Sequence, residues 1–127
     1  KEGRREIRKD SDEILGFFSV ALWYEIQKLS PQLKAIIDDE SDFFHYNQNG
    51  SVLRGENGEW GLIQIKSGTW EWFSELRQNQ KLRMLDKLNP FHQLEMLRWA
   101  EQNDLLEHWS CVKEKRCITQ DIVSSTD

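Results

Sequence analysis

The sequence is short of cysteine, of positive charge and of long apolar runs, and each shortage excludes a class of protein. Its net charge of −5 lacks the basic footprint of a nucleic-acid binder. Its longest nearly apolar run, residues 14–24, is shorter than the about 20 residues needed to cross a bilayer. Two cysteines, with no histidine pair at ligand spacing, do not make a zinc site. We therefore expect a globular chain with no nucleic-acid partner and no membrane span.

The ends of the chain differ in composition from its middle. A basic start followed by an apolar stretch is typical of a secretory signal, but Asp10, Asp12 and Glu13 stand directly before that stretch. No small-residue cleavage site follows, so we reject the signal reading. At 127 residues the chain predicts one domain, which we place at residues 11–117, between a charged lead-in (1–10) and a loose tail (118–127).

Helical periodicity dominates the pattern. Apolar residues recur at helical spacing from Ile14 to Leu29, and Pro31 then opens a second helix with a buried face. Further helices are predicted from Ser67 or Thr69, carrying apolar residues as far as Leu88, and from Asn89-Pro90 to about residue 105. Three tryptophans are assigned to the core: Trp23, Trp99 and Trp109.

The helical periodicity is interrupted between residues 43 and 65, where turn-forming residues are frequent. Asn49-Gly50 is a strong signal for a hairpin turn, and three more glycines follow by residue 61. The predicted fold class is therefore α+β, mostly helical, with one small β-hairpin.

One constellation points to a known family. Glu40-Ser41 would close the second helix, the hairpin follows, and Gly61-Leu-Ile-Gln-Ile with Trp70 comes after it. In this order and spacing, over about residues 30–75, the sequence resembles the lysozyme superfamily, which includes animal-type lysozymes and soluble lytic transglycosylases. The resemblance implies a lysozyme-like fold with the hairpin beside a catalytic cleft, and Glu40 matches the family's catalytic glutamate.

The chemistry of Glu40 agrees with that role. Cleavage of a glycosidic bond needs a carboxylic acid that is still protonated near neutral pH. A helix C-terminus, the neighbouring aspartates and the apolar Phe43 and Phe44 each raise a carboxyl pKa. The alternative reading is a solvated residue at a helix end.

The other site residues are less specific. Glu59 is the candidate second carboxylate, where animal-type lysozymes carry an aspartate and many transglycosylases carry none; Glu56 and Asp42 are its substitutes. We expect Ser41, Gln64, Trp60 and Trp70 to contribute to substrate binding, although Gln64 also suits a structural role and either tryptophan also suits the core.

Metal and cofactor chemistry finds little support. His45 to Glu56 imitates the spacing of a calcium loop, but its first ligand is histidine instead of aspartate, so we read it as a plain turn. The three histidines fit surface or packing roles. No metal or organic cofactor is expected. Cys111 and Cys117 form a disulfide if the protein is exported and stay free thiols if it is not.

These observations predict a monomeric, extracytoplasmic muramidase that cleaves the β-1,4 linkage between N-acetylmuramic acid and N-acetylglucosamine in the glycan strand of peptidoglycan. One alternative is a lytic transglycosylase, which gives 1,6-anhydro products. Another is a non-catalytic domain on the same fold that only binds glycan or a partner, because fold does not imply function.

Overall fold

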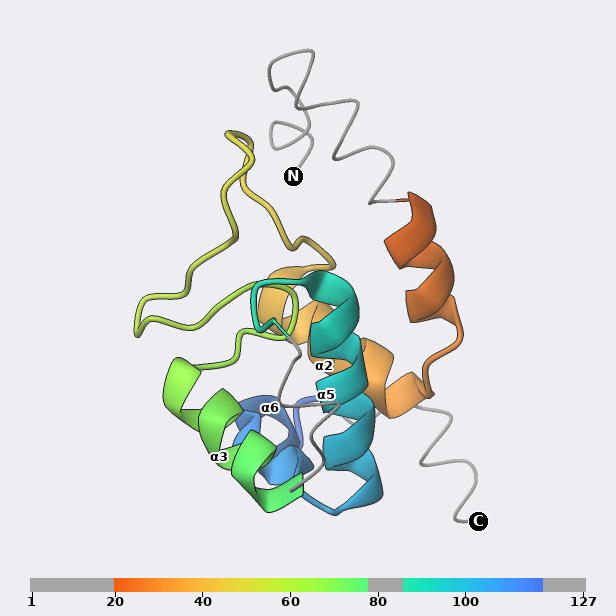
Figure 1. The fold of residues 1–127 in the computed structure, drawn as a ribbon. Coiled ribbons are helices and arrows are strands. Elements are labelled where there is room, and N and C mark those ends of the chain that lie inside the picture. Colours follow the sequence, from red (N-terminus) through yellow and green to blue (C-terminus); the bar gives the residue numbers. More distant parts are fainter. Residues whose placement is uncertain (1–19, 78–85, 118–127) are drawn as a thin grey trace.

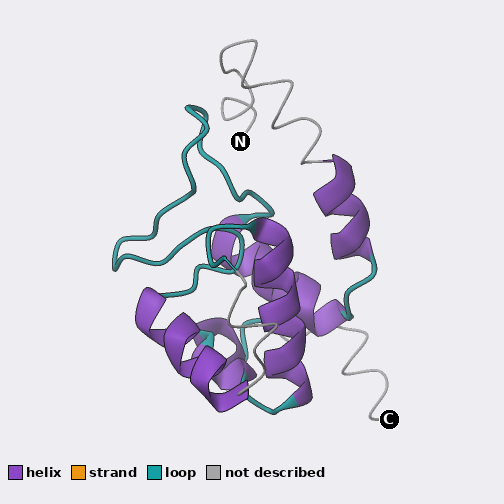
Figure 2. Ribbon diagram, in the orientation of Figure 1, coloured by secondary structure: helices purple, strands orange, loops and turns teal. Residues whose placement is uncertain are grey.

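The computed structural model describes residues 20–77 and 86–117, and helices form most of this part of the chain (Figures 1 and 2). The predicted lead-in (1–10) and tail (118–127) lie outside it. A first helix occupies residues 20–27. The labelled helices follow in chain order: α2 (Pro31–Ser41), α3 (Ser67–Arg77), α5 (Pro90–Gln102), the 3-10 turn η2 (Leu106–His108) and α6 (Ser110–Lys113).

Side-chain caps start the two central helices where the sequence predicts them to start. The Ser30 hydroxyl accepts a hydrogen bond from the Leu33 N–H at the start of α2 (3.3 Å). The Asn89 side chain accepts from the Phe91 N–H at the start of α5 (2.9 Å). Proline follows each cap, at a position where its missing N–H costs nothing.

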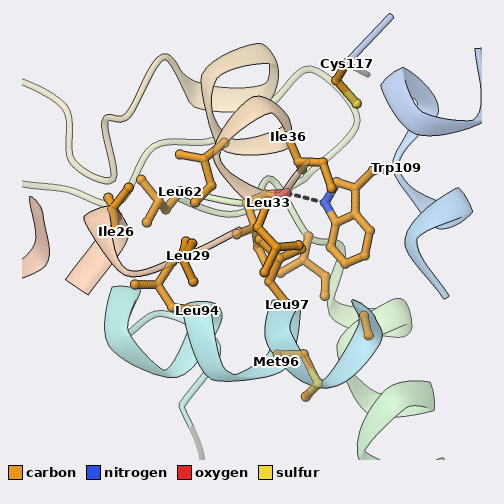
Figure 3. Packing of buried hydrophobic residues seen from close by; sticks show 14 of the residues in the cluster. Ile26, Leu29, Leu33, Ile36, Leu62, Leu94, Met96, Leu97, Trp109 and Cys117 are labelled. Atoms are coloured by element: carbon orange, nitrogen blue, oxygen red, sulfur yellow. Dashed lines mark hydrogen bonds between the residues drawn. The ribbon is translucent and has the colours of Figure 1, made fainter. Parts of the chain in front are cut away.

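The core lies where the first helix, α2 and α5 meet (Figure 3). The apolar faces of these helices are almost completely excluded from solvent, as the periodicity predicts. The Trp109 indole N–H donates to the Ile63 carbonyl (2.7 Å; the dashed line in Figure 3), which ties the C-terminal part of the chain to residue 63. The largest fully buried apolar side chains of the core are Phe73, Ile26, Leu33, Ile36, Ile37, Leu62, Ile63, Leu94, Met96 and Leu97.

Residues 43–66, here called the bridged loop, take the place of the predicted hairpin. Three isolated antiparallel bridges cross it, namely Tyr46 with Val52, Arg54 with Trp60, and Trp60 with Ile65. No continuous strand forms in the described residues. The mostly helical prediction is therefore confirmed, while the β-hairpin is not.

The predicted turn is present at the tip of this loop. Gly50 has a φ of 88°, which favours glycine, and its N–H donates to the Asn47 carbonyl (3.0 Å). The tip stands out from the helices in Figure 1.

Three expectations need correction or fall outside the described residues. The first helix is observed over residues 20–27, and the part predicted before it is not described. Trp23 is 50% exposed and is not a core residue, although its ring makes an edge contact with Phe43. Leu88 lies in a turn before α5 and not in a continuation of α3, whereas Leu82 and Leu85 are not described.

Among the helices that the structure describes, none is long and apolar enough to cross a bilayer.

Candidate active site

Glu40 lies in the last turn of α2, and backbone geometry fixes it there. Asp42 and Phe43 both take positive φ angles (58° and 67°), and the Asp42 N–H donates to the Asp38 carbonyl (3.0 Å). This left-handed cap ends the helix directly after Ser41. The helix macrodipole is negative at that end, so it disfavours a carboxylate on Glu40.

The surroundings of Glu40 keep a large fraction of it protonated near neutral pH. Partial burial, then the charge of Asp39, then that of Glu59 raise the pKa of Glu40 from 4.5 to about 7, while Arg116 opposes them. Desolvation and like charge are two of the ways in which glycosidases adjust a catalytic acid. The position can therefore donate a proton at neutral pH, which an ordinary glutamate does poorly.

Glu59 and Gln64 lie together above Gly55. A side chain at Gly55 would overlap the carboxylate of Glu59 and the amide oxygen of Gln64, so it would displace the ends of these two side chains from their present positions. One oxygen of Glu59 accepts from the Asn57 N–H (2.9 Å), and the Gln64 amide donates to the Gly61 carbonyl (2.8 Å). Because the charge of Glu59 acts on Glu40, the structure brings together both predicted carboxylates, one from α2 and one from the bridged loop.

The remaining predicted binding residues are already engaged within the protein. Ser41 is 5% exposed, and its hydroxyl donates to the Ile37 carbonyl (3.1 Å). Trp70 is 7% exposed and belongs to the core. The Arg54 guanidinium stacks over the Trp60 ring at 3.6 Å, so a cation occupies one aromatic face.

The substitute carboxylates are placed less favourably than Glu59. Glu56 is exposed in the bridged loop. Asp42 is the residue that caps α2. The carboxylate charges that raise the pKa of Glu40 are those of Asp39 and Glu59.

Two residues that sequence reasoning treated as ordinary hold the bridged loop in place. The buried Gln93 of α5 accepts from the Ile63 N–H (2.9 Å) and donates to the carbonyls of Trp60 (3.0 Å) and Lys87 (2.6 Å). The buried His45 accepts from the Leu62 N–H at Nδ1 (2.9 Å), so Nε2 carries the proton and donates to the Leu88 carbonyl (2.6 Å). A glutamine on an otherwise apolar helix face was the available signal for Gln93.

Metal binding is poorly supported by this arrangement. Both ring nitrogens of His45 are used, so the first position of the calcium-like pattern has no free ligand atom. Over residues 20–77 and 86–117, one group of ligand atoms comes within 4.8 Å of one another, from Asp39, Glu40 and Cys111. Its sulfur belongs to the Cys111–Cys117 disulfide and offers no thiolate.

A pocket of about 270 Å³ lies away from these carboxylates, between the first helix and α5. None of the predicted site residues lines it. Its walls include Ala21, Tyr24 and Glu25 on one side and Phe91, Leu94 and Arg98 on the other.

Comparison with protein-family models, with curated proteins and with solved structures finds no match to the chain. The residues themselves, and the resemblance that their motifs carry, are therefore the basis for a function.

Proposed function

We propose that the protein is a peptidoglycan glycosidase that cleaves the β-1,4 linkage between N-acetylmuramic acid and N-acetylglucosamine, with Glu40 as the general acid. The observation that carries the proposal is the pKa of Glu40, raised to about 7 beside a second carboxylate from a separate element. A raised acid paired with a carboxylate is what glycoside hydrolysis requires. The motif resemblance to lysozymes identifies the same residue.

The proposed reaction uses both carboxyl groups, Glu40 for proton transfer and Glu59 for stabilising the positive charge. Glu40 gives its proton to the glycosidic oxygen, the bond from that oxygen to C1 breaks, and the positive charge that develops at C1 is stabilised by the carboxylate of Glu59. Water then bonds to C1 and returns a proton to the carboxylate of Glu40, which restores the acid. The products are two ordinary sugar ends, one of them reducing.

A lytic transglycosylase is the alternative in the same class. There the C6 hydroxyl of the muramic acid attacks C1 in place of water and gives its proton to Glu40, forming a 1,6-anhydro end. The hydrogen bond that one oxygen of Glu59 accepts from Asn57 is compatible with a loop residue that takes no part in the reaction. The non-catalytic domain is the alternative from another class.

The proposed substrate is extracytoplasmic, and we propose the same location for the protein. The Cys111–Cys117 disulfide supports it, because disulfides persist in oxidising compartments. We expect the chain to act as a monomer.

The experiment compares Glu40→Gln with Asp38→Asn, which changes an exposed carboxylate on the same helix. Purified peptidoglycan is digested, clearing is followed by turbidity, and fragments are identified by mass spectrometry. We expect Glu40→Gln to lose about 10²–10⁴-fold in rate and Asp38→Asn to keep its activity. A folded Glu40→Gln protein with wild-type activity would refute the proposal.

A second arm uses Glu59→Gln and distinguishes the alternatives. Hydrolysis predicts reducing ends and at least about tenfold slower turnover in this variant. Anhydro ends with unchanged turnover assign the transglycosylase reaction instead. Wild-type protein that sediments with peptidoglycan but releases no fragments would assign the non-catalytic role.

A further inference from the structure

The Cys111–Cys117 disulfide closes a short loop that carries an arginine beside the end of α2. Within the loop the Arg116 N–H donates to the Cys111 carbonyl (2.7 Å), so the backbone turns tightly before Cys117. The Arg116 guanidinium reaches Asp39, with 2.9 Å between Nη1 and the carboxylate oxygen. Glu114 and Ser110 accept from its other nitrogens at 2.8 and 3.2 Å. Three side-chain contacts therefore define where this cation lies.

The loop is attached along α2 at two points. The Gln32 amide, near the start of the helix, donates to the Cys117 carbonyl (2.9 Å), while Asp39 pairs with Arg116 near its end. Residues 32 and 39 are two turns apart and share one helix face. The loop thus lies along the face that leads to Glu40, and the Cys111 sulfur is within 4.8 Å of the carboxylate oxygens of Asp39 and Glu40.

Charges from three elements face Glu40. Asp39 on its own helix and Glu59 on the bridged loop raise the pKa of Glu40, and Arg116 on the disulfide loop lowers it. Arg116 is the one cation in the described part of the chain that opposes the two carboxylates. An acid that first gives and then regains a proton works best with a pKa near the working pH, so a further rise would make Glu40 a weaker proton donor in the first step.

We propose that Arg116 is a positioning residue for Glu40: the disulfide loop holds its guanidinium on Asp39, where it balances one of the two carboxylates that face the acid. The inference rests on the proposed function for its catalytic meaning, whereas the electrostatic coupling between Arg116 and Glu40 is independent of any reaction. It also gives the Cys111–Cys117 bond a role at the site, because that bond fixes the backbone that carries the cation.

The test measures the titration of Glu40 directly, without substrate. The full chain is labelled with ¹³C at the glutamate carboxyl groups, and the Glu40 signal is assigned as the one missing from Glu40→Gln. Arg116→Gln is compared with Lys115→Gln, which removes the same charge from the neighbouring exposed residue of the loop. We expect Arg116→Gln to raise the pKa of Glu40 above the wild-type value and Lys115→Gln to leave it unchanged.

Two further variants show whether the charge and the loop are both needed. Arg116→Lys, which keeps the charge, should bring the pKa back toward the wild-type value. The double variant Cys111→Ser, Cys117→Ser should raise it as Arg116→Gln does. Because Arg116 is partly exposed, 1 M salt should shrink the difference between wild type and Arg116→Gln.

The activity arm follows the pH dependence of kcat/KM on peptidoglycan, whose alkaline limb should move to higher pH in Arg116→Gln with little change in KM. Equal shifts in the pKa of Glu40 in Arg116→Gln and Lys115→Gln, or no shift in either variant, would overturn the inference. If the double cysteine variant does not fold, the result for Arg116→Gln decides the question. If the pKa of Glu40 shifts as expected but the protein does not cleave peptidoglycan, the proposed function is refuted, and the coupling between Arg116 and Glu40 still holds.

Discussion

α2 and α5 meet through aliphatic side chains, whereas the bridged loop combines buried apolar side chains such as Leu62 with hydrogen bonds to the side chain of Gln93 on α5. On the helical side, Ile36, Ile37 and Leu97 are fully excluded from solvent, and their contribution scales with the apolar area they bury. On the loop side, Gln93 and His45 satisfy backbone groups between Trp60 and Ile63, where no strand ladder does so. We therefore expect the contact between α2 and α5 to tolerate repacking of its side chains, whereas the position of the bridged loop depends on individual hydrogen bonds.

The largest effect is expected from breaking the helical side. Phe73 of α3 is completely buried and packs against Trp99 and Trp109 with ring centroids 5.4 and 6.1 Å away. Phe73→Ala should lower the free energy of unfolding by about 3–5 kcal/mol through lost burial and the cavity that remains. Leu76→Ala, on the same helix but 49% exposed, should change it by at most about 0.5 kcal/mol. Urea unfolding measures both, and similar values would show that α3 does not close the core.

Protonation should weaken the loop side. Burial, which outweighs the opposing effects of the Leu88 carbonyl and Asp86, lowers the pKa of His45 from 6.5 to about 4. The unfolded chain therefore binds more protons than the folded one between these values. The contribution of neutral His45 is complete above pH 6.5 and is lost as the pH falls toward 4, by about 3 kcal/mol.

The measurement is the difference in unfolding free energy between wild type and His45→Asn at several pH values. That difference should shrink from pH 7 to pH 4, since the wild type alone loses the histidine contribution. Leu76→Ala, at an exposed position and without a titratable side chain, supplies the control and should show no such trend. A constant difference for His45→Asn would mean that the ring does not hold the loop as a neutral group.

A smaller effect tests how closely the loop fits against α5. A methyl group at Gly61 would lie 2.6 Å from the Nδ1 of His45 and 2.7 Å from the amide nitrogen of Gln93. Gly50 has a similar positive φ but open space around it, so Gly50→Ala pays for backbone strain alone, about 1–2 kcal/mol. Gly61→Ala should cost about 1–3 kcal/mol more because of the overlap. Equal costs in thermal or urea unfolding would contradict the close fit.

The smallest effect is an expected gain in the free energy of unfolding, and it concerns Glu40, at the end of α2 beside the bridged loop. Its pKa in the folded protein, about 7, exceeds the ordinary 4.5, so ionisation of Glu40 destabilises the fold progressively between these pH values. Glu40→Gln should therefore be more stable than wild type at pH 7.5, by about 1–2 kcal/mol once solvent screening of the partly exposed carboxyl is considered. At pH 4 the two proteins should be equally stable.

The same variant that abolishes the proposed activity is thus expected to gain stability. Asp38→Asn, an exposed change on the same helix, should show no gain at either pH. Circular dichroism during urea unfolding at pH 4 and 7.5 provides the comparison. A Glu40→Gln protein that is less stable at pH 7.5 would place Glu40 in an environment that favours its charge.

Features that depend on neighbouring residues in the sequence could be predicted from it. Periodicity and the Ser30-Pro31 and Asn89-Pro90 signals predict the starts of α2 and α5, because helix caps are local features. The raised pKa of Glu40 was also predictable in direction from the helix end and the nearby aspartates. Its coupling to Glu59 was expected from the motif order, but no local rule gives the distance between two elements.

The rest depended on contacts between distant residues. The bonds from Gln93 to Trp60 and Ile63 span 33 and 30 residues, and the pair of Arg116 with Asp39 spans 77. Trp23 was assigned to the core from its position in an apolar run, but it is half exposed and contacts the ring of Phe43 at the edge of the core. Residues 43–66 carry turn signals without enough alternation for a ladder, so hydrogen bonds from side chains replace one.

The hydrogen bond from the Trp109 indole to the Ile63 carbonyl has a consequence for the order in which the chain folds as it is synthesised. The hydrogen-bond partners of the Ile63 backbone, Gln93 and Trp109, are synthesised 30 and 46 residues later. At the roughly 5–20 residues per second of ribosomal synthesis, α2 with Glu40 has seconds to form before the turn next to it is fastened. Until Trp109 has been synthesised, the Ile63 carbonyl lacks this indole partner, so the bridged loop that carries Glu59 is attached by one hydrogen bond fewer in a nascent chain.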